Sequence, residues 1–234
     1  MRILFLADLH GNMTATLAMD RVIRSLAPDD IWFLGDCVGK GPRNDETCDY
    51  VRSVCRHWIG GNWDYGIGFR EFPADAFFWD QLGEERLAWL RGLPQEDEIR
   101  AEGLRIRLFH GRPVTPLLTV EMNASQLIPL FSTDRGVFDG VIFADSHRPF
   151  VRTLSCGYLA NTGSVGNSMG VPRAHALILE TFPLSRALSL QVLSVPYDNE
   201  AEAALARATP DLPHGDAYIR EVLTGIYSRG LSES

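Results

Sequence analysis

Three short motifs near the start of the chain place metal-ligating side chains directly after apolar runs. The motifs are Asp-Leu-His-Gly-Asn at 8–12, Gly-Asp at 35–36 and Gly-Asn at 61–62. Carboxylate and amide oxygens, together with imidazole nitrogens, form the ligand set that divalent ions of hard to borderline character prefer. The three motifs therefore predict a site for two divalent metal ions.

Each motif contributes a different ligand to this predicted site. Asp8 and His10 are two residues apart, so at a strand end their side chains point the same way and can hold one ion. The carboxylate of Asp36 can bridge two ions, and Asn62 offers an uncharged amide oxygen. Asn12 begins a helix whose N-terminal N–H groups favour a phosphate. Taken singly, each residue is as typical of a loop cap or a turn, so the prediction depends on the ordered set.

Two further histidines follow apolar strands later in the chain. His110 comes after the run 104–109 and precedes a glycine, and His147 follows the run 141–144. Both are expected to supply imidazole ligands because they occupy the same kind of strand-end position as the first motifs. A lone histidine is more often structural or exposed, and that is the expectation for His57, His175 and His214.

The elements that must position these residues alternate between strand and helix. Apolar runs at 3–7, 31–34 and 58–59 predict buried strands, and helical spacing predicts helices over 13–26 and 47–57. A βαβαβ order favours parallel strands with right-handed crossovers. Ligands then bind beyond the carboxyl ends of the strands, where the first three motifs fall.

The rest of the chain predicts a second group of strands. Alternating patterns around Glu-Gly at 102–103 predict a hairpin of 95–101 with 104–109. Further short strands are expected at 141–144, 150–154, 158–160, 174–179 and 188–195. The predicted fold class is α/β, a four-layer αββα sandwich of two mixed sheets flanked by helices, with the metal site at strand C-terminal ends.

The segment 63–80 is unusually aromatic for a surface loop. It contains Trp63, Tyr65, Phe69, Phe72, Phe77, Phe78 and Trp79. So many aromatic side chains are expected to pack against other apolar surface, either in the core, on a second subunit or in a lid over the substrate. A homo-oligomer formed through this segment is one expectation.

Composition narrows the class of protein. The 234 residues carry a formal net charge of −8, which argues against stable nucleic-acid binding and against binding to an anionic membrane. The four cysteines show no C-x-x-C spacing and are expected to be reduced thiols. Asp8 interrupts the N-terminal apolar run, which indicates a strand rather than a signal peptide, and no run is long enough to span a membrane. A cytoplasmic location is expected.

The order of these motifs resembles the calcineurin-like metallophosphoesterase superfamily. The resemblance covers about the first 200 residues and implies that Asp8 and His10 bind one metal ion, that Asp36 bridges both, and that Asn62 and His110 bind the second. The family's last motif, Gly-His-Thr-His, aligns with Ala-Asp-Ser-His at 144–147. In that alignment His147 is a ligand of the first ion.

Further features resemble the small bacterial and archaeal phosphodiesterase-like subgroup. Asn-Thr-Gly-Ser-Val-Gly at 161–166 is similar to that subgroup's Asn-Pro-Gly-Ser-Val-Gly turn, and Gly-Lys-Gly-Pro at 39–42 is also typical of it. The resemblance implies a metallophosphoesterase domain over 1–198. It implies a helical tail at 199–234, packed on the same domain and divided by two prolines.

Two positions depart from the family pattern. Trp63 stands where many members place a histidine that protonates the leaving group, and an indole N–H cannot shuttle a proton near neutral pH. Asp145 stands where the family has a histidine ligand of the second ion. It is either an oxygen ligand of that ion, favouring Mn²⁺, or the cap of a turn. Arg148, next to the last motif, and Trp63 itself are expected to contact substrate, although a solvated charge is the alternative for Arg148.

The resemblance implies a metal-dependent phosphoesterase that attacks phosphodiesters or phosphoanhydrides with a metal-bridging hydroxide, with Asp36 and Asn62 as catalytic residues. Two divalent ions are the expected cofactors, Mn²⁺ before Fe, Zn, Ni or Mg. The expected partner is a small-molecule or nucleotide phosphoester. Two alternatives remain open: a metal- or nucleotide-binding protein with weakened catalysis, and an interaction scaffold on the same fold.

Overall fold

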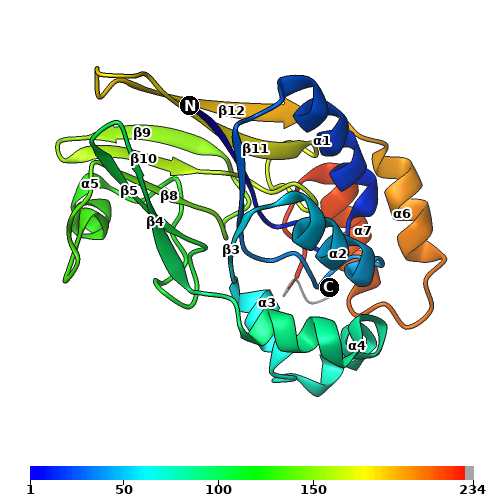
Figure 1. Ribbon diagram of the computed structural model, residues 1–234. Helices are drawn as coiled ribbons and strands as arrows, with labels where there is room; N and C mark the ends of the chain where they lie inside the picture. The colour runs from blue at the N-terminus through cyan, green and yellow to red at the C-terminus, as the bar shows by residue number, and fades with distance from the viewer. Residues whose placement is uncertain (230–234) are drawn as a thin grey trace.

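Two five-stranded β-sheets pack against each other in the computed structural model, which describes residues 1–229 (Figure 1). The first sheet has the strand order β12-β11-β1-β2-β3 and the second has the order β4-β5-β8-β10-β9. Both sheets are mixed, and helices lie on their outer faces. The predicted α/β fold with two mixed sheets flanked by helices is therefore confirmed.

The first sheet is built from the predicted N-terminal βαβαβ unit. Strands β1 (Arg2–Leu6), β2 (Asp30–Leu34) and β3 (His57–Ile59) are parallel, and helices α1 (Met13–Leu26) and α2 (Asn44–Val54) connect them. The hairpin of β11 (Ala174–Thr181) and β12 (Leu188–Val195) extends this sheet, with β11 antiparallel to β1. Parallel pairing brings the carboxyl ends of β1, β2 and β3 to one edge.

The second sheet starts with the predicted hairpin, β4 (Glu96–Ala101) and β5 (Leu104–Phe109). Strand β8 (Gly140–Phe143) runs parallel to both β5 and β10 (Gly157–Asn161), and β9 (Phe150–Leu154) closes the edge antiparallel to β10. A separate two-stranded ribbon joins β6 (Ser132–Thr133) and β7 (Gly136–Val137). Sequence periodicity did not predict this ribbon because each strand has only two residues.

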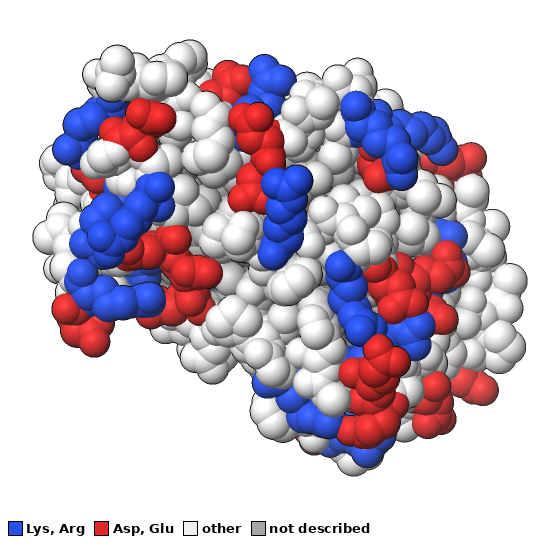
Figure 2. Space-filling model, viewed as in Figure 1, with Lys and Arg blue, Asp and Glu red and all other residues white. Residues whose placement is uncertain are grey.

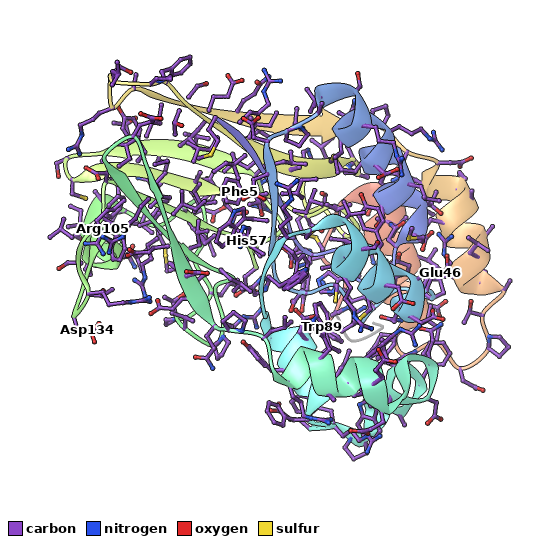
Figure 3. All side chains as sticks on the ribbon, in the orientation of Figure 1. Phe5, Glu46, His57, Trp89, Arg105 and Asp134 are labelled. Atoms are coloured by element: carbon purple, nitrogen blue, oxygen red, sulfur yellow. The ribbon has the colours of Figure 1, made fainter. Side chains whose placement is uncertain are left out.

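Alternation along β1 explains how one strand serves two cores. Ile3 and Phe5 face the second sheet, and Leu4 and Leu6 face the helices, because successive side chains of a strand point to opposite faces. Phe5 lies fully buried in the interior between the sheets (Figure 3). Complete burial of such a side chain stabilises the fold by about 1.5–3 kcal/mol.

The helical layers on the two outer faces are unequal. The first sheet is covered by α1, α2 and α4 (Ala76–Arg91), together with α6 (Asn199–Arg207) and α7 (Gly215–Thr224). The second sheet is covered by the short α5 (Ala124–Leu127) and the 3₁₀ turn Ile128–Phe131. Figure 1 shows α5 on the opposite side of the molecule from α1, α6 and α7.

Several predicted boundaries shift by a few residues. The second helix spans 44–54 rather than 47–57, because Cys55 takes an extended conformation and His57 already belongs to β3. Helix α4 is broken at Gly83, whose φ of 68° is not helical. A short helix α3 (Asn62–Gly68) and a 3₁₀ turn (Pro73–Asp75) precede it.

The aromatic segment 63–80 packs mostly on the main core. Five of its seven aromatic side chains contact the core between the first sheet and the helices, namely Trp63, Tyr65, Phe77, Phe78 and Trp79. Phe69 and Phe72 remain 57% and 58% exposed. Most of the aromatic surface is thus used within the chain, and an oligomer formed through this segment stays a prediction.

The C-terminal helices lie against the first helix and its neighbouring loop. Glu202 of α6 is fully buried, where its carboxylate accepts hydrogen bonds from Thr14 at 2.6 Å, from Arg43 at 2.7 Å and from the hydroxyl of Tyr218 in α7 at 2.9 Å. The division into 1–198 and 199–234 stays a prediction, and residues 230–234 of the expected tail lie outside the described residues. Within residues 1–229, no helix is long and apolar enough to cross a membrane.

Candidate metal centre

The three N-terminal motifs lie together at the carboxyl edge of the parallel strands. Asp8 follows β1, Asp36 follows β2 and Asn62 follows β3. Backbone hydrogen bonds hold the first two loops side by side, because the Asp8 N–H donates to Gly35 O at 2.8 Å and the His10 N–H donates to Asp36 O at 3.2 Å. The parallel topology therefore joins three segments that are far apart in sequence.

Five of the predicted ligands form two overlapping clusters, and all five are buried. The first cluster contains Asp8, His10 and His147, and the second contains Asp8, Asp36 and His110. Within each cluster the ligand atoms lie within 4.8 Å of one another. The second sheet supplies His110 and His147 from the ends of β5 and β8, so the site lies where the two sheets meet.

All three histidines have one ring nitrogen fixed by a backbone carbonyl. The Nδ1 atoms of His10, His110 and His147 lie 3.0, 2.6 and 2.5 Å from Val38 O, Leu34 O and Asn167 O. A carbonyl only accepts, so each neutral ring carries its proton on Nδ1 and directs the lone pair of Nε2 into the site. Metal-binding histidines are commonly oriented in this way.

The directed lone pairs need a cation. The Nε2 atoms of His10 and His147 lie 3.2 Å apart, and two lone pairs at that distance repel each other. Two nitrogens bound to one ion at about 2.1 Å lie roughly 3.0–3.4 Å apart, which matches the observed spacing. The spacing of the pair therefore fits the prediction that both histidines bind one ion.

Buried polar atoms without partners mark the same place. Within residues 1–229, both carboxylate oxygens of Asp8, Oδ1 of Asn62 and Nε2 of His110 are buried and accept or donate no hydrogen bond. Leaving such atoms unpaired costs about 1–3 kcal/mol each. Oxygen and imidazole atoms of this kind fit divalent metal ions, so the residues present are suited to the predicted cofactor.

Asp36 faces both clusters. Its Oδ2 lies 3.2 Å from Nε2 of His110 and 3.9 Å from Nε2 of His10. Its Oδ1 accepts a hydrogen bond from the Trp63 N–H at 2.8 Å, which orients the carboxylate. A Cβ on Gly61 would collide with Oδ1 of Asp36, so only glycine allows the third motif to approach this closely.

The backbone is strained at the candidate ligands. Five of the seven predicted ligand positions have a positive φ: Asp8 (54°), His10 (48°), Asp36 (61°), Asp145 (67°) and His147 (57°). Residues other than glycine avoid this region, and such strain gathers at functional sites. The surrounding hydrogen bonds must therefore outweigh the free-energy cost of these backbone conformations.

Asp64 supplies much of this support, although the sequence analysis assigned it no role. Its carboxylate accepts hydrogen bonds from the N–H groups of Asp36 at 2.7 Å, Cys37 at 3.0 Å and Gly61 at 3.0 Å. It thereby ties the second motif to the third. Burial and then the charge of Asp36 raise the pKa of Asp64 to about 7. The sequence signal for this role was the position of Asp64 at the end of Gly-Asn-Trp-Asp, residues 61–64.

The turn at 161–167 supports the other side of the site. The Ser164 hydroxyl and the Gly166 N–H donate to Asp8 O at 2.8 and 2.9 Å. Asn12 caps α1 by accepting from the Ala15 N–H and donates from Nδ2 to Gly166 O at 2.7 Å. The side chain of Asn12 is thus occupied by structural bonds, and its predicted contact with substrate stays a prediction.

Electrostatics favour ionised carboxylates at this site. Burial opposes the charge on Asp8, but the nearby rings of His147 and His110 outweigh it and hold the pKa of Asp8 well below its usual value. Burial lowers the pKa of His10 to about 4. Burial also opposes a charge on His110, yet the carboxylates of Asp36 and Asp8 raise its pKa well above the usual value. Metal binding needs a neutral imidazole and would therefore release a proton from His110.

Comparison with known proteins assigns this chain to a family. Residues 1–182 match the model of the calcineurin-like phosphoesterase superfamily domain. The chain belongs to the calcineurin-like phosphoesterase superfamily. Family and fold together indicate a metallophosphoesterase.

Relatives of this superfamily member come from bacteria and archaea. It is 27% identical over 219 residues to the uncharacterized protein MJ0912 of Methanocaldococcus jannaschii, covering 82% of this chain and 86% of that protein. A metallophosphoesterase from Sphaerobacter thermophilus is 27% identical, with a TM-score of 0.75 over 97% of this chain and 99% of that one. The hypothetical protein PH1004 of Pyrococcus horikoshii OT3 shares the fold, at 19% identity and a TM-score of 0.78 over 97% and 99% of the chains.

Asp145, one of the two departures from the superfamily pattern, is bonded to Arg112. The guanidinium donates from Nη2 to Oδ1 at 2.5 Å and from Nε to Oδ2 at 2.9 Å, and the Arg112 N–H donates to Oδ2 at 3.0 Å. Asp145 belongs to neither cluster of candidate ligands among the described residues. It joins the loop after β8 to the loop after β5, and its role as a metal ligand stays a prediction.

The remaining predicted contacts are divided between pocket and surface. Trp63 lines a cavity of about 380 Å³ beside Asp36, Asn62 and His147. Arg148 is exposed and does not line this cavity, and its Nη1 lies 3.1 Å from Oε1 of Glu121.

Charged side chains of both signs are interspersed over the face of the molecule that Figure 2 shows.

Proposed function

We propose that this superfamily member hydrolyses phosphodiesters or phosphoanhydrides with two divalent metal ions, Mn²⁺ being the expected ion. The observation that carries the proposal is that the Nε2 atoms of His10, His110 and His147 lie 3.5, 3.8 and 3.2 Å from Oδ1 of Asp8. Both oxygens of Asp8 and Oδ1 of Asn62 are buried and have no hydrogen-bond partner within residues 1–229. Imidazole nitrogens grouped with such oxygens form the ligand set of a divalent ion.

The ligands divide between two positions. Asp8, His10 and His147 would hold one ion, and Asn62 and His110 would hold the other. Asp36, whose Oδ2 faces a histidine of each set, would join the two positions. When bound, such ions neutralise charge on the phosphoryl group and lower the pKa of a water molecule.

The chain's own residues would orient the reaction. Asn62 places a neutral oxygen at the mouth of the cavity, so it adds a ligand without adding negative charge that would repel a phosphate. Trp63 occupies the adjacent wall, where its indole excludes water but cannot deliver a proton near neutral pH. The leaving oxygen must therefore carry its own negative charge.

Leaving-group dependence tests this proposal. Purified protein loaded with Mn²⁺ should hydrolyse bis(p-nitrophenyl) phosphate and anhydrides far faster than dialkyl phosphates. Metal analysis should find about two ions per chain. If the protein binds two ions but turns over none of these substrates, the result would support the alternative of a metal- or nucleotide-binding protein with weakened catalysis. A protein that binds no metal would contradict the proposal.

A further inference from the structure

A cavity opens from the candidate metal centre toward the C-terminal segment. Its lining includes the polar residues Asp36, Asn62 and His147, together with Trp63 and the aromatic rings of Phe72 and Tyr227, which are each 58% exposed. Three cationic side chains also line it, namely Lys40, Arg112 and Arg229. Arg112 is bonded to Asp145, whereas Lys40 and Arg229 were not needed to build the metal centre.

Lys40 is buried at this cavity, and its hydrogen-bond partner within residues 1–229 is neutral. Its Nζ donates to Oδ1 of Asn167 at 2.9 Å, a neutral acceptor, and lies 5.8 Å from the centre of the Trp63 ring. An ammonium group has three donors, so two remain for other acceptors. Burial lowers the pKa of Lys40 to about 8, which leaves most of the population charged at pH 7.

Arg229 lies over the same indole. Its guanidinium carbon is 5.2 Å from the Trp63 ring centre, within cation–π range. Its Nε and Nη2 atoms are buried and have no hydrogen-bond partner within residues 1–229. Two buried donors without acceptors are costly, and an anion in the cavity would satisfy them.

Glu221 forms an ion pair with Arg229 but accepts no hydrogen bond from it within residues 1–229. Oε2 of Glu221 lies 3.6 Å from Nε of Arg229. The Glu221 carboxylate already accepts from the Ser228 N–H at 3.1 Å and from Nδ2 of Asn167 at 3.2 Å. Asp75 also lines the cavity, and burial raises its pKa.

We propose that Lys40 and Arg229 bind the second phosphoryl group of a phosphoanhydride whose first phosphorus lies at the metal centre. The inference rests on the proposed function and narrows its substrate class to phosphoanhydrides. Phe72 and Tyr227 at the rim suit an aromatic base attached to that substrate, as in a nucleoside diphosphate.

This substrate class explains why residue 63 need not be a proton donor. The oxygen of water forms a bond to the first phosphorus, and the bridging P–O bond breaks. One proton of the water is released to solvent, and the other stays on the new phosphate according to its pKa. The electron pair of the broken bond leaves on the oxygen of the second phosphoryl group, which is a stable anion at neutral pH without an added proton. Lys40 and Arg229 lie where that new charge would be stabilised.

A binding experiment with non-hydrolysable ligands tests the subsite without relying on turnover. The dissociation constants of AMP and α,β-methylene-ADP are measured by calorimetry with Mn²⁺ for wild type, Arg229→Gln and Arg220→Gln. Arg220 is an exposed cation on α7 outside the cavity, so its replacement makes the same charge change elsewhere. We expect wild type and Arg220→Gln to bind α,β-methylene-ADP about tenfold or more tightly than AMP, and Arg229→Gln to lose that preference.

Lys40→Gln provides a second variant, since glutamine keeps a donor near Asn167 but removes the charge. Thermal melts establish that each variant is folded. Equal loss of affinity for both ligands in Arg229→Gln, or an unchanged preference, would overturn the proposed subsite. Turnover of bis(p-nitrophenyl) phosphate by wild type reports on the proposed function separately, so either proposal can fail while the other stands.

Discussion

Replacing Asp145 by alanine separates the two roles that the sequence left open for this residue, metal ligand or structural anchor. The hydrogen bonds of its carboxylate lead us to expect the anchor. Nε and Nη2 of Arg112 and the Arg112 N–H together make four contacts to the two oxygens. These three donors engage most of the roughly four lone-pair positions of a carboxylate and direct both oxygens toward Arg112.

The expected loss of stability follows from these contacts. The Arg112 side chain is 47% exposed, so solvent screening limits the ion pair to about 1 kcal/mol or less. The hydrogen bond from the Arg112 N–H to a charged acceptor adds about 1.5–2 kcal/mol. The free energy of unfolding should therefore fall by about 2–3 kcal/mol, which corresponds to roughly 4–10 °C in Tm for a chain of this size.

The decisive assay is thermal unfolding in the presence of a chelator, combined with metal analysis. Without metal, an unbonded ligand carboxylate only repels Asp8 and Asp36, so its removal would leave Tm unchanged or raise it. An anchoring carboxylate instead lowers Tm when removed, and about two ions per chain should remain once metal is restored. Asp134→Ala is the matched control, because Asp134 is exposed and points outward at the edge of the molecule (Figure 3). Loss of one ion with an unchanged Tm would refute the anchor and establish the ligand.

Three further predictions concern the metal centre and the pH dependence of stability. Asp36→Asn should abolish phosphoesterase activity and lower the metal content, because the negative charge between the two proposed ion positions is lost. Full activity with two ions bound would show that Asp36 has no part in the mechanism. His10→Ala and His147→Ala should each lose the same ion by metal analysis, and loss of different ions would contradict the 3.2 Å pairing of their Nε2 atoms. Burial lowers the pKa of His175, which bonds to Ser168, to about 4. The unfolded chain therefore binds its proton first, so unfolding free energy measured in urea should fall by about 2–3 kcal/mol between pH 7 and pH 4, and His175→Gln should show a smaller fall.

The sequence by itself determined the elements that carry the site and the types of ligand. Apolar runs ending at polar motifs predicted β1, β2 and β3, because a strand buried on both faces must be apolar until it leaves the sheet. The βαβαβ order then predicted parallel strands, and their carboxyl ends place Asp8, Asp36 and Asn62 together. These inferences hold because strand direction and side-chain alternation are local properties of the chain.

Only the tertiary structure decided which atoms meet across distant segments. No local pattern predicts that Arg112 bonds to Asp145, that Asn167 O orients His147, or that Arg229 reaches the ring of Trp63. These contacts depend on how the second sheet and the C-terminal helices pack on the first sheet, and packing is a property of whole surfaces. The sequence therefore identified the ligand types, whereas the packing of the two sheets determined their tautomers, their partners and the cations that face the substrate.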